Sequence, residues 1–185
     1  MSSLTIDIIE QCKLNDRKAQ MQLYNQYCNG MYIVAKRFIS DSMEAEDVVQ
    51  EAFIKAFTKL HQYKAEVTFG AWLKRIVINK SIDLLKSKKQ QLMELNEVHL
   101  KVVDQDYDDN WLIDDAITID EVKAAIEQLP EKYKYVVMLF LIEGYDHQEI
   151  SGILGISEVA SRTQLSRGKT KLKDLLKQKE HGTGY

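Results

Sequence analysis

The sequence has few of the residues that interrupt secondary structure or build disulfide and metal sites. Its 185 residues include one proline, eight glycines and two cysteines. Strand-rich domains need frequent turn residues, so this scarcity argues against them. Cys12 and Cys28 form no Cys-x-x-Cys pair, and with four scattered histidines they predict no metal site and no cofactor. Apolar residues instead recur at spacings of three and four, which predicts an all-α fold.

Long apolar runs are also missing. The longest, at 136–142, has seven residues, whereas a membrane-spanning helix needs about 20. The first seven residues show no basic segment followed by an apolar one, so they do not resemble a secretory signal. These observations predict a cytoplasmic protein.

The formal net charge of −3 hides an uneven distribution. Residues 1–90 carry 14 Lys or Arg against 10 Asp or Glu, residues 91–122 carry 1 against 10, and residues 123–185 carry 10 against 8. Nearly all of the excess acid therefore lies in the middle, where a stretch such as 104–110 cannot pack a core. We predict two small helical domains, 1–90 and 119–185, joined by an acidic linker at 91–118.

Helix signals divide the two domains further. In the first, one or two helices are expected over 4–38, another from a cap at Asp41 or Ser42 to about Leu60, and another over 69–89, with an aperiodic polar stretch at 61–68. In the second, helices are expected at 119–128, 131–143, 147–154 and 158–178.

The segment 147–165 has the pattern of a helix-turn-helix. Ser151 is a small residue where the two helices would cross, and Gly155 tolerates the positive φ of the turn. The apolar residues that would lock the pair are Ile150, Leu154, Ile156 and Leu165. The pattern alone also fits an ordinary helical hairpin with a solvated basic face.

The helix after this turn is strongly basic. Its cations are Arg162, Arg167, Lys169, Lys171, Lys173, Lys177 and Lys179, against Glu158 and Asp174. Such cations can neutralise phosphates, while Ser161, Arg162 and Gln164 near the helix start are placed to reach base edges.

Further motifs carry a family resemblance. The segments DVVQEAF at 47–53 and FGAWLKRIVIN at 69–79, then Asp83, resemble the first domain of the extracytoplasmic-function (ECF) sigma factors of bacterial RNA polymerase. LPEKY at 129–133 and IEGYDHQEI at 142–150 resemble the start of their second domain. The matches occur in the family's order and cover nearly the whole chain apart from the acidic segment.

This resemblance implies a non-catalytic subunit that binds core RNA polymerase and directs it to promoters. It implies contacts to the clamp of the largest subunit through Asp47, Gln50 and Glu51. The loop 61–68 would capture a flipped base of the −10 element, in a pocket that Asn79 helps to line. The implied −10 contacts are His61, Gln62, Tyr63, Lys64, Lys74, Arg75, Asn79 and Lys80.

The second domain would read the −35 element through its helix-turn-helix. The implied −35 contacts are Ser157, Glu158, Ser161, Arg162, Gln164, Arg167 and Lys169. The implied partners are the clamp and flap of core RNA polymerase, promoter DNA and an anti-sigma factor, membrane-bound or not, with the free protein a monomer. One departure concerns the recognition helix, which often reads Gly-Thr-Val-Lys-Ser-Arg-Leu in this family and reads VASRTQL at 159–165 here.

Other interpretations of these residues remain. Phe69, Trp72 and Ile76 fit a core stripe better than DNA contacts, and Glu46 and Asp47 also suit the first turn of any helix. The acidic pairs 108–109 and 114–115 are better explained as solvated linker than as a metal or acid/base site, and no catalytic residue is assigned.

Two rival functions also remain. A conventional regulator with a sensing domain would account for the turn but not for the motifs at 47–53 and 69–79. An anti-sigma or adaptor protein would account for polymerase binding but not for the basic recognition helix.

Overall fold

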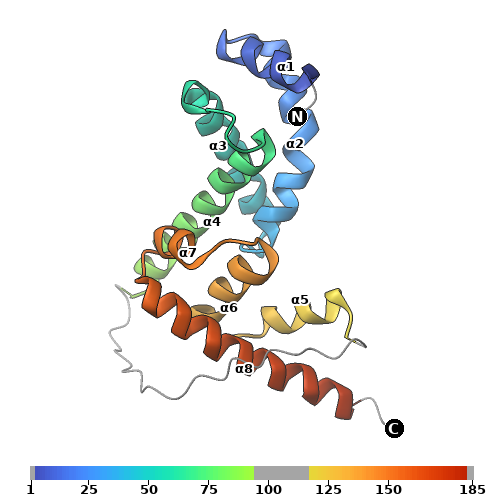
Figure 1. Ribbon diagram of the computed structural model, residues 1–185, viewed down its shortest axis with the longest axis vertical. Helices are drawn as coiled ribbons and strands as arrows, with labels where there is room; N and C mark the ends of the chain where they lie inside the picture. Colours follow the sequence, from blue (N-terminus) through green and yellow to red (C-terminus); the bar gives the residue numbers. More distant parts are fainter. Residues whose placement is uncertain (1–2, 94–116, 183–185) are drawn as a thin grey trace. The chain divides into compact units, whose positions relative to one another are not determined.

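The computed structural model describes residues 3–93 and 117–182, and in these two ranges every regular element is helical (Figure 1). The chain divides into two compact units, Met1–Val98 and His99–Tyr185. The predicted all-α, two-domain fold is therefore confirmed. Residues 94–116, which make up most of the predicted linker, lie outside the described ranges, and residues 91–93 belong to the last turn of a helix. Within the described ranges no helix is long and apolar enough to cross a membrane.

Unit 1 contains α1 (Ser3–Lys13), α2 (Arg17–Lys36), α3 (Ser42–Thr58), a short 3-10 turn η1 (Leu60–Gln62) and α4 (Phe69–Met93). Helices α2, α3 and α4 pack against one another, and α1 packs on α2. Their shared core is fully buried and includes Leu23, Phe53, Phe69, Leu73 and Ile78. The ring of Phe53 lies 4.8 Å from that of Tyr24, so α3 meets α2 through an aromatic pair of favourable geometry.

Side-chain caps set the starts of the first helices. The Asp16 carboxylate accepts the N–H groups of Lys18 and Ala19 at 2.8 and 3.0 Å, which begins α2. Of the two residues expected to begin α3, Asp41 is the cap, because its carboxylate accepts the Glu44 N–H at 2.9 Å. Each cap satisfies backbone donors that the helix itself leaves unpaired.

Unit 2 contains α5 (Ile119–Glu127), α6 (Glu131–Val137), a π-helical turn η2 (Met138–Ile142), α7 (His147–Leu154) and α8 (Glu158–Gly182). Thr118 and Glu121 form a reciprocal capping box at the start of α5. Helix α8 packs across α5, α6 and α7. At its crossing with α6 lies Gly168, where a Cβ atom would come within 2.4 Å of the Val137 side chain. The close approach of these two helices therefore depends on a residue with no side chain.

The helices expected to end at 89 and 178 continue to Met93 and Gly182, and the largest departure from the expected helices is at 131–143. There the α-helix gives way to the π-turn η2, in which the Glu143 N–H bonds the Met138 carbonyl at 3.1 Å. Gly144, at φ 76°, ends the segment. The apolar run 136–142 shows no change of period at this point, so the sequence contains no signal for the wider turn.

Candidate nucleic-acid and protein-binding surfaces

The outer face of α3 is the first candidate surface. Asp47, Gln50 and Glu51 are all exposed, whereas Val48 and Ala52, from the same turns, are buried. The alternation follows from the 3.6-residue period of the helix, which sends one stripe into the core and leaves the other in solvent.

Two apolar residues on this outer face were not predicted. Met43 and Ile54 are largely exposed, and they stand at helical spacing from Asp47 and Gln50. Met43 lies four residues before Asp47, and Ile54 lies four residues after Gln50. This helical spacing is the signal by which sequence reasoning could have found them. An exposed face that mixes carboxylates with large apolar side chains suits contact with a protein.

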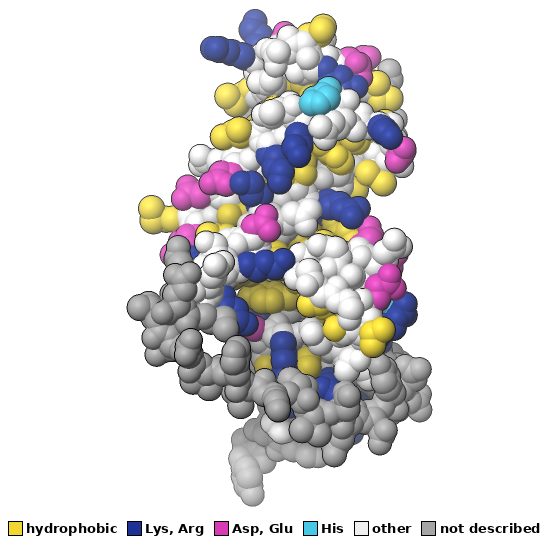
Figure 2. Space-filling model, turned by 90° about the vertical axis from the view of Figure 1, so that its left-hand side faces the viewer, with side chains coloured by type: hydrophobic (Ala, Val, Ile, Leu, Met, Phe, Trp, Pro, Cys, Tyr) yellow, Lys and Arg dark blue, Asp and Glu magenta, His cyan; other side chains and the backbone are white. Residues whose placement is uncertain are grey.

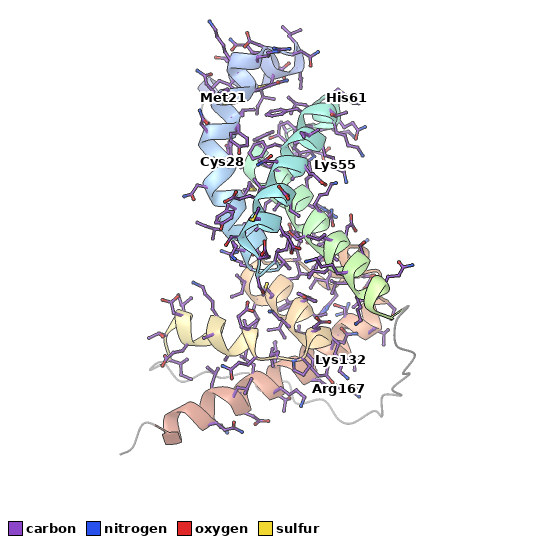
Figure 3. All side chains as sticks on the ribbon, turned by 180° about the vertical axis from the view of Figure 1, so that it is seen from behind. Met21, Cys28, Lys55, His61, Lys132 and Arg167 are labelled. Atoms are coloured by element: carbon purple, nitrogen blue, oxygen red, sulfur yellow. The ribbon has the colours of Figure 1, made fainter. Side chains whose placement is uncertain are left out.

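The second candidate surface is the loop 61–68, at the end of unit 1 where Figure 3 labels His61. His61, Gln62 and Lys64 are exposed, as a contact role requires. Ala65 holds a left-handed backbone at φ 60°, an unfavourable conformation for a residue with a Cβ atom. The backbone of the loop therefore makes a specific left-handed turn at Ala65.

Tyr63 corrects part of this prediction. Its side chain is only 6% exposed, its hydroxyl donates to the Val67 carbonyl at 2.7 Å, and its ring lies 5.9 Å from Phe69 and 5.3 Å from Trp72. Burial raises the pKa of the phenol. The structure thus uses Tyr63 to tie the two ends of the loop to α4, and it does not present the ring as a DNA contact.

Helix α4 supplies the remaining residues predicted for the −10 element. Arg75 is exposed, whereas Lys74, Asn79 and Lys80 are half-buried. Arg75 and Asn79 are four residues apart and so share one side of the helix. Figure 2 shows Lys and Arg side chains interspersed with exposed apolar ones on the face of unit 1 that it presents. Phe69 is fully buried, which confirms it as core.

Trp72 and Ile76, which were also predicted to be core, are half-buried. Trp72 packs against Tyr63 and Phe69, with its ring 5.8 Å from that of Phe69. Trp72 therefore packs against Tyr63 and supports the loop 61–68 from α4.

The third candidate surface is the helix-turn-helix of α7 and α8. Gly155 has a left-handed backbone at φ 70°, which confirms the predicted turn glycine. The hydroxyl of Ser151 donates to the Ile156 carbonyl at 2.7 Å, and the Ser151 carbonyl accepts the Gly155 N–H at 2.9 Å. Ser151 is thus hydrogen-bonded to both Gly155 and Ile156 and holds the turn together.

The apolar lock between the helices differs slightly from the prediction. Ile150 and Leu165 are buried as expected, Leu154 and Ile156 are half-buried, and Ile153 is an additional buried member.

The start of α8 contains a second correction. Ser161 is fully buried, and its hydroxyl lies 2.9 Å from Nδ1 of His147, the first residue of α7. Ser161 therefore joins the two helices and is not available to a base edge. His147 is stacked on Phe140, and burial, followed by the nearby charge of Arg162, lowers its pKa. This environment favours the neutral imidazole. Its Nδ1 either donates a hydrogen bond to the Ser161 hydroxyl or accepts one from it, depending on the tautomer.

The other residues predicted at this end of α8 lie at or near the surface. Ser157 is the cap, because its hydroxyl accepts the Ala160 N–H at 3.1 Å. Glu158 and Arg162 are exposed and face each other at 3.4 Å, and Gln164 is half-buried. An exposed ion pair of this kind is weak, so Arg162 can exchange its partner for a nucleic-acid group at little cost.

Arg167 and Lys169 contact other residues of unit 2. Both Arg167 and Lys132 act on Tyr133, with the Lys132 Nζ 4.8 Å from the centroid of its ring, and Figure 3 labels the two cations near each other. Burial acts to raise the pKa of Tyr133, but the hydrogen bonds and charges of these two cations together outweigh it and lower the pKa. Lys169 lies 5.5 Å over the ring of Phe140. Five residues separate Arg167 from Arg162, so the two arginines point about 140° apart around the helix.

The described residues include no cluster of three or more His, Cys, Asp or Glu side chains that could hold a metal ion. The acidic pairs at 108–109 and 114–115 lie outside the described ranges. Cys12 is buried, and this burial raises the pKa of its thiol to about 11, which keeps the sulfur protonated and unreactive.

Known proteins resemble the chain in both units. Residues 23–91 match the family model for sigma-70 region 2, and residues 119–172 match the one for sigma-70 region 4. The ECF RNA polymerase sigma factor SigW of Bacillus subtilis is 32% identical over 177 residues, which cover 91% of this chain and 95% of SigW. SigE of Mycolicibacterium smegmatis is 31% identical over 156 residues, covering 84% of this chain, which spans 60% of the length of SigE.

Two solved structures share the fold. CnrH, in complex with the cytosolic domain of CnrY, is similar with a TM-score of 0.54 at 24% identity, over 92% of this chain and 96% of that one. RpoE of Bartonella quintana, in complex with the anti-sigma factor NepR, gives a TM-score of 0.54 at 20% identity, over 85% and 96%. Because the identity to SigW extends over nearly the whole of both chains, and both region models match in order, the chain belongs to the ECF RNA polymerase sigma factors.

Proposed function

We propose that the two units of this sigma factor divide promoter recognition between them. As a sigma factor the protein directs RNA polymerase to promoters in transcription initiation. In the proposed division, unit 1 binds core polymerase through α3 and takes up a melted base of the −10 element beside α4. Unit 2 reads duplex DNA at the −35 element through α8. The observation that carries the proposal is the α7–Gly155–α8 turn, whose second helix exposes Arg162 while Ser161 and Leu165 hold it to the unit.

The polymerase contact is proposed for the outer face of α3. This face exposes Asp47, Gln50 and Glu51, while Val48 and Ala52 on the other side of α3 are buried in the core. Met43 and Ile54 extend the face with exposed apolar area, and Figure 1 shows α3 between α2 and α4. The partner that fits is a cationic surface with small apolar patches, for which we propose the clamp of the largest subunit. A second contact, to the flap, is proposed for unit 2.

The proposed −10 site combines a shaped loop with a basic helix. The loop is closed by the bond from Tyr63 to Val67, and the helix that follows it carries Arg75 and Asn79 on one side. A base that has left the stack offers its edge to hydrogen bonds and its face to stacking, and this loop offers His61 and Gln62 for such contacts. Lys74, Arg75 and Lys80 can balance nearby phosphates.

The −35 site is proposed for the outward side of α8. The remaining candidates on α8 and its cap are Ser157, Glu158, Arg162, Gln164, Arg167 and Lys169. By the helix period, Glu158, Arg162 and Lys169 share one side, whereas Gln164 and Arg167 lie toward another. An α-helix that is fixed to a neighbouring helix by a tight turn can enter the major groove as one rigid element.

The proposed regulatory partner is an anti-sigma factor that binds this protein as a free monomer in the cytoplasm. Of the two solved structures with the same fold, one is CnrH in complex with the cytosolic domain of CnrY, and the other is the sigma factor RpoE in complex with the anti-sigma factor NepR. Non-catalytic action also belongs to this proposal, because no step in it requires the chain to make or break a covalent bond.

Two measurements test the proposed function. Purified full-length chain should bind core RNA polymerase in a pull-down, and the complex should open promoter DNA, seen as permanganate-reactive thymines near −10. A regulator that binds DNA without core polymerase would fail the first measurement. An adaptor that binds core without reading DNA would pass the first and fail the second.

A further inference from the structure

Val159 is a large apolar residue in the first turn of α8, and it is 70% exposed. The polar groups around it are engaged with one another. Glu158 pairs with Arg162 at 3.4 Å, and the Thr163 hydroxyl donates to the carbonyl of Val159 itself at 2.9 Å. The two methyl groups of Val159 therefore form the main apolar feature on the exposed side of this turn.

The direction of Val159 follows from the helix period. The side of α8 that packs into unit 2 contains Ser161, Leu165, Gly168 and Leu172. Val159 comes two residues before Ser161, which turns it about 160° away from that side around the helix axis. It therefore points out of the unit, toward the space that a DNA groove would occupy if α8 were the recognition helix.

A single exposed apolar residue is common and by itself means little. Its place distinguishes this one. It lies at the N-terminal end of the helix, where recognition helices contact base edges, and it is 70% exposed there. The apolar contact that it can make therefore falls where base edges are read.

The major groove offers one apolar group that distinguishes a base, the 5-methyl of thymine. Valine has no hydrogen-bonding group and can distinguish bases only by such contact. We propose that Val159 is a specificity-determining residue whose methyl groups contact the 5-methyl of one thymine in the −35 element. This inference rests on the proposed reading of the −35 element by α8.

The test begins with a promoter library that is randomised across the −35 element and selected by core polymerase bound to the full-length chain. Each thymine of the selected sequence is then replaced singly by deoxyuridine, which removes the methyl and keeps the base pair. At one position, deoxyuridine should weaken closed-complex formation by the wild-type protein about fourfold, the effect of losing contact with one methyl group. Val159→Ala should bind the thymine promoter about fourfold more weakly and should not respond to deoxyuridine there.

A matched control comes from the same unit. Ile119 is 72% exposed on α5, outside the helix-turn-helix, so Ile119→Ala removes a comparable apolar side chain. This variant should keep the wild-type response to deoxyuridine. Circular dichroism of both variants should match that of the wild type, because neither side chain is part of the core.

The two levels of the proposal fail in different ways. A selection that yields no preference at the −35 element would overturn the proposed function of α8 itself. A clear −35 preference with Val159→Ala retaining the full methyl response at every thymine would overturn only the role of Val159.

Discussion

The carboxylate of Glu51 lies 2.6 Å from the ammonium of Lys80, and this ion pair joins the proposed polymerase-binding face of α3 to the proposed promoter-binding helix α4. A second pair, between Glu44 and Lys88, joins the same two helices. Glu51 is therefore placed to act in two ways, as a contact to the polymerase and as a partner that positions Lys80. The two roles can be separated by experiment.

Glu51→Lys should weaken the binding of core polymerase, because it reverses a charge on the proposed contact face. Its effect on the free energy of unfolding should stay below about 1 kcal/mol, because the Glu51 side chain is 60% exposed and solvent screens its pair with the half-buried Lys80. Competition binding to core polymerase and urea unfolding measure the two effects. The control is the charge swap Glu51→Lys with Lys80→Glu, which restores the pair. If the swap regained wild-type affinity for core polymerase, Glu51 would act only through Lys80.

Tyr63→Phe should loosen the loop 61–68, because it removes the hydrogen bond to the Val67 carbonyl and keeps the ring packing. We expect a loss of about 1 kcal/mol in the free energy of unfolding. Promoter opening should be impaired, while the binding of closed duplex DNA should change little. Permanganate reactivity reports the first effect and gel shifts of the holoenzyme the second. Tyr32→Phe on α2 is the matched removal of a hydroxyl, and an equal opening defect in that variant would argue against a specific role for Tyr63.

The helices and most of the core follow from local sequence, because capping residues and apolar spacing act over a few positions. Asp41 and Gly155 both have the structural roles that the sequence predicts. Tyr63 and Ser161 do not, since both were assigned to DNA and both are buried. Ser161 is buried against His147, fourteen residues away, and Tyr63 packs under a loop whose path depends on Ala65 and Val67. The spacing of Ser161 four residues before Leu165 could have indicated its burial, but its bond to His147 and the packing of Tyr63 depend on tertiary contacts.

Gly168→Ala should destabilise unit 2, because the new Cβ would lie 2.4 Å from a methyl of Val137 and 3.3 Å from the Cβ of Tyr133. Overpacking of this kind costs about 1–3 kcal/mol. Hydrogen exchange of the full-length chain should show faster exchange in α6 and α8, with unit 1 unchanged.

Two further variants check this reading of the helix crossing. Val137→Ala in the Gly168→Ala background should restore part of the protection, since it removes the clashing methyl. Gly152→Ala on α7 is the matched control, because nothing lies within 4 Å of its added Cβ. It should leave protection unchanged or raise it, as alanine favours a helix more than glycine does.

The stability of unit 2 should depend on pH through His147. Its pKa is lowered in the folded protein, first by burial and then by Arg162, so the folded state binds the proton less well than the unfolded state. The resulting stability is fully present above the ordinary histidine pKa and is lost as the pH falls through the folded value. Hydrogen exchange in α7 and α8 between pH 7.5 and 5.5 should show this loss, and His147→Gln should flatten it. A wild-type profile that stays flat would contradict the assignment.

Asn79 and Arg162 should affect different steps of initiation. Asn79→Ala should leave closed-complex formation largely unchanged and impair opening, because its proposed contact forms only after a base leaves the stack. The loss of one such hydrogen bond should cost about 1–3 kcal/mol, or roughly 5- to 150-fold in the opening equilibrium.

Arg162→Ala should instead weaken the closed complex and reduce its salt dependence, because a duplex contact precedes melting. Arg162 is exposed and held only by a weak pair to Glu158, so its removal should not unfold α8. A preformed bubble template distinguishes the two residues. It should bypass the need for Arg162 more than the need for Asn79, whose contact to a flipped base is still required. Permanganate footprinting on duplex and bubble promoters measures both steps. Equal defects for the two variants at each step would show that the two units do not divide the work in this way.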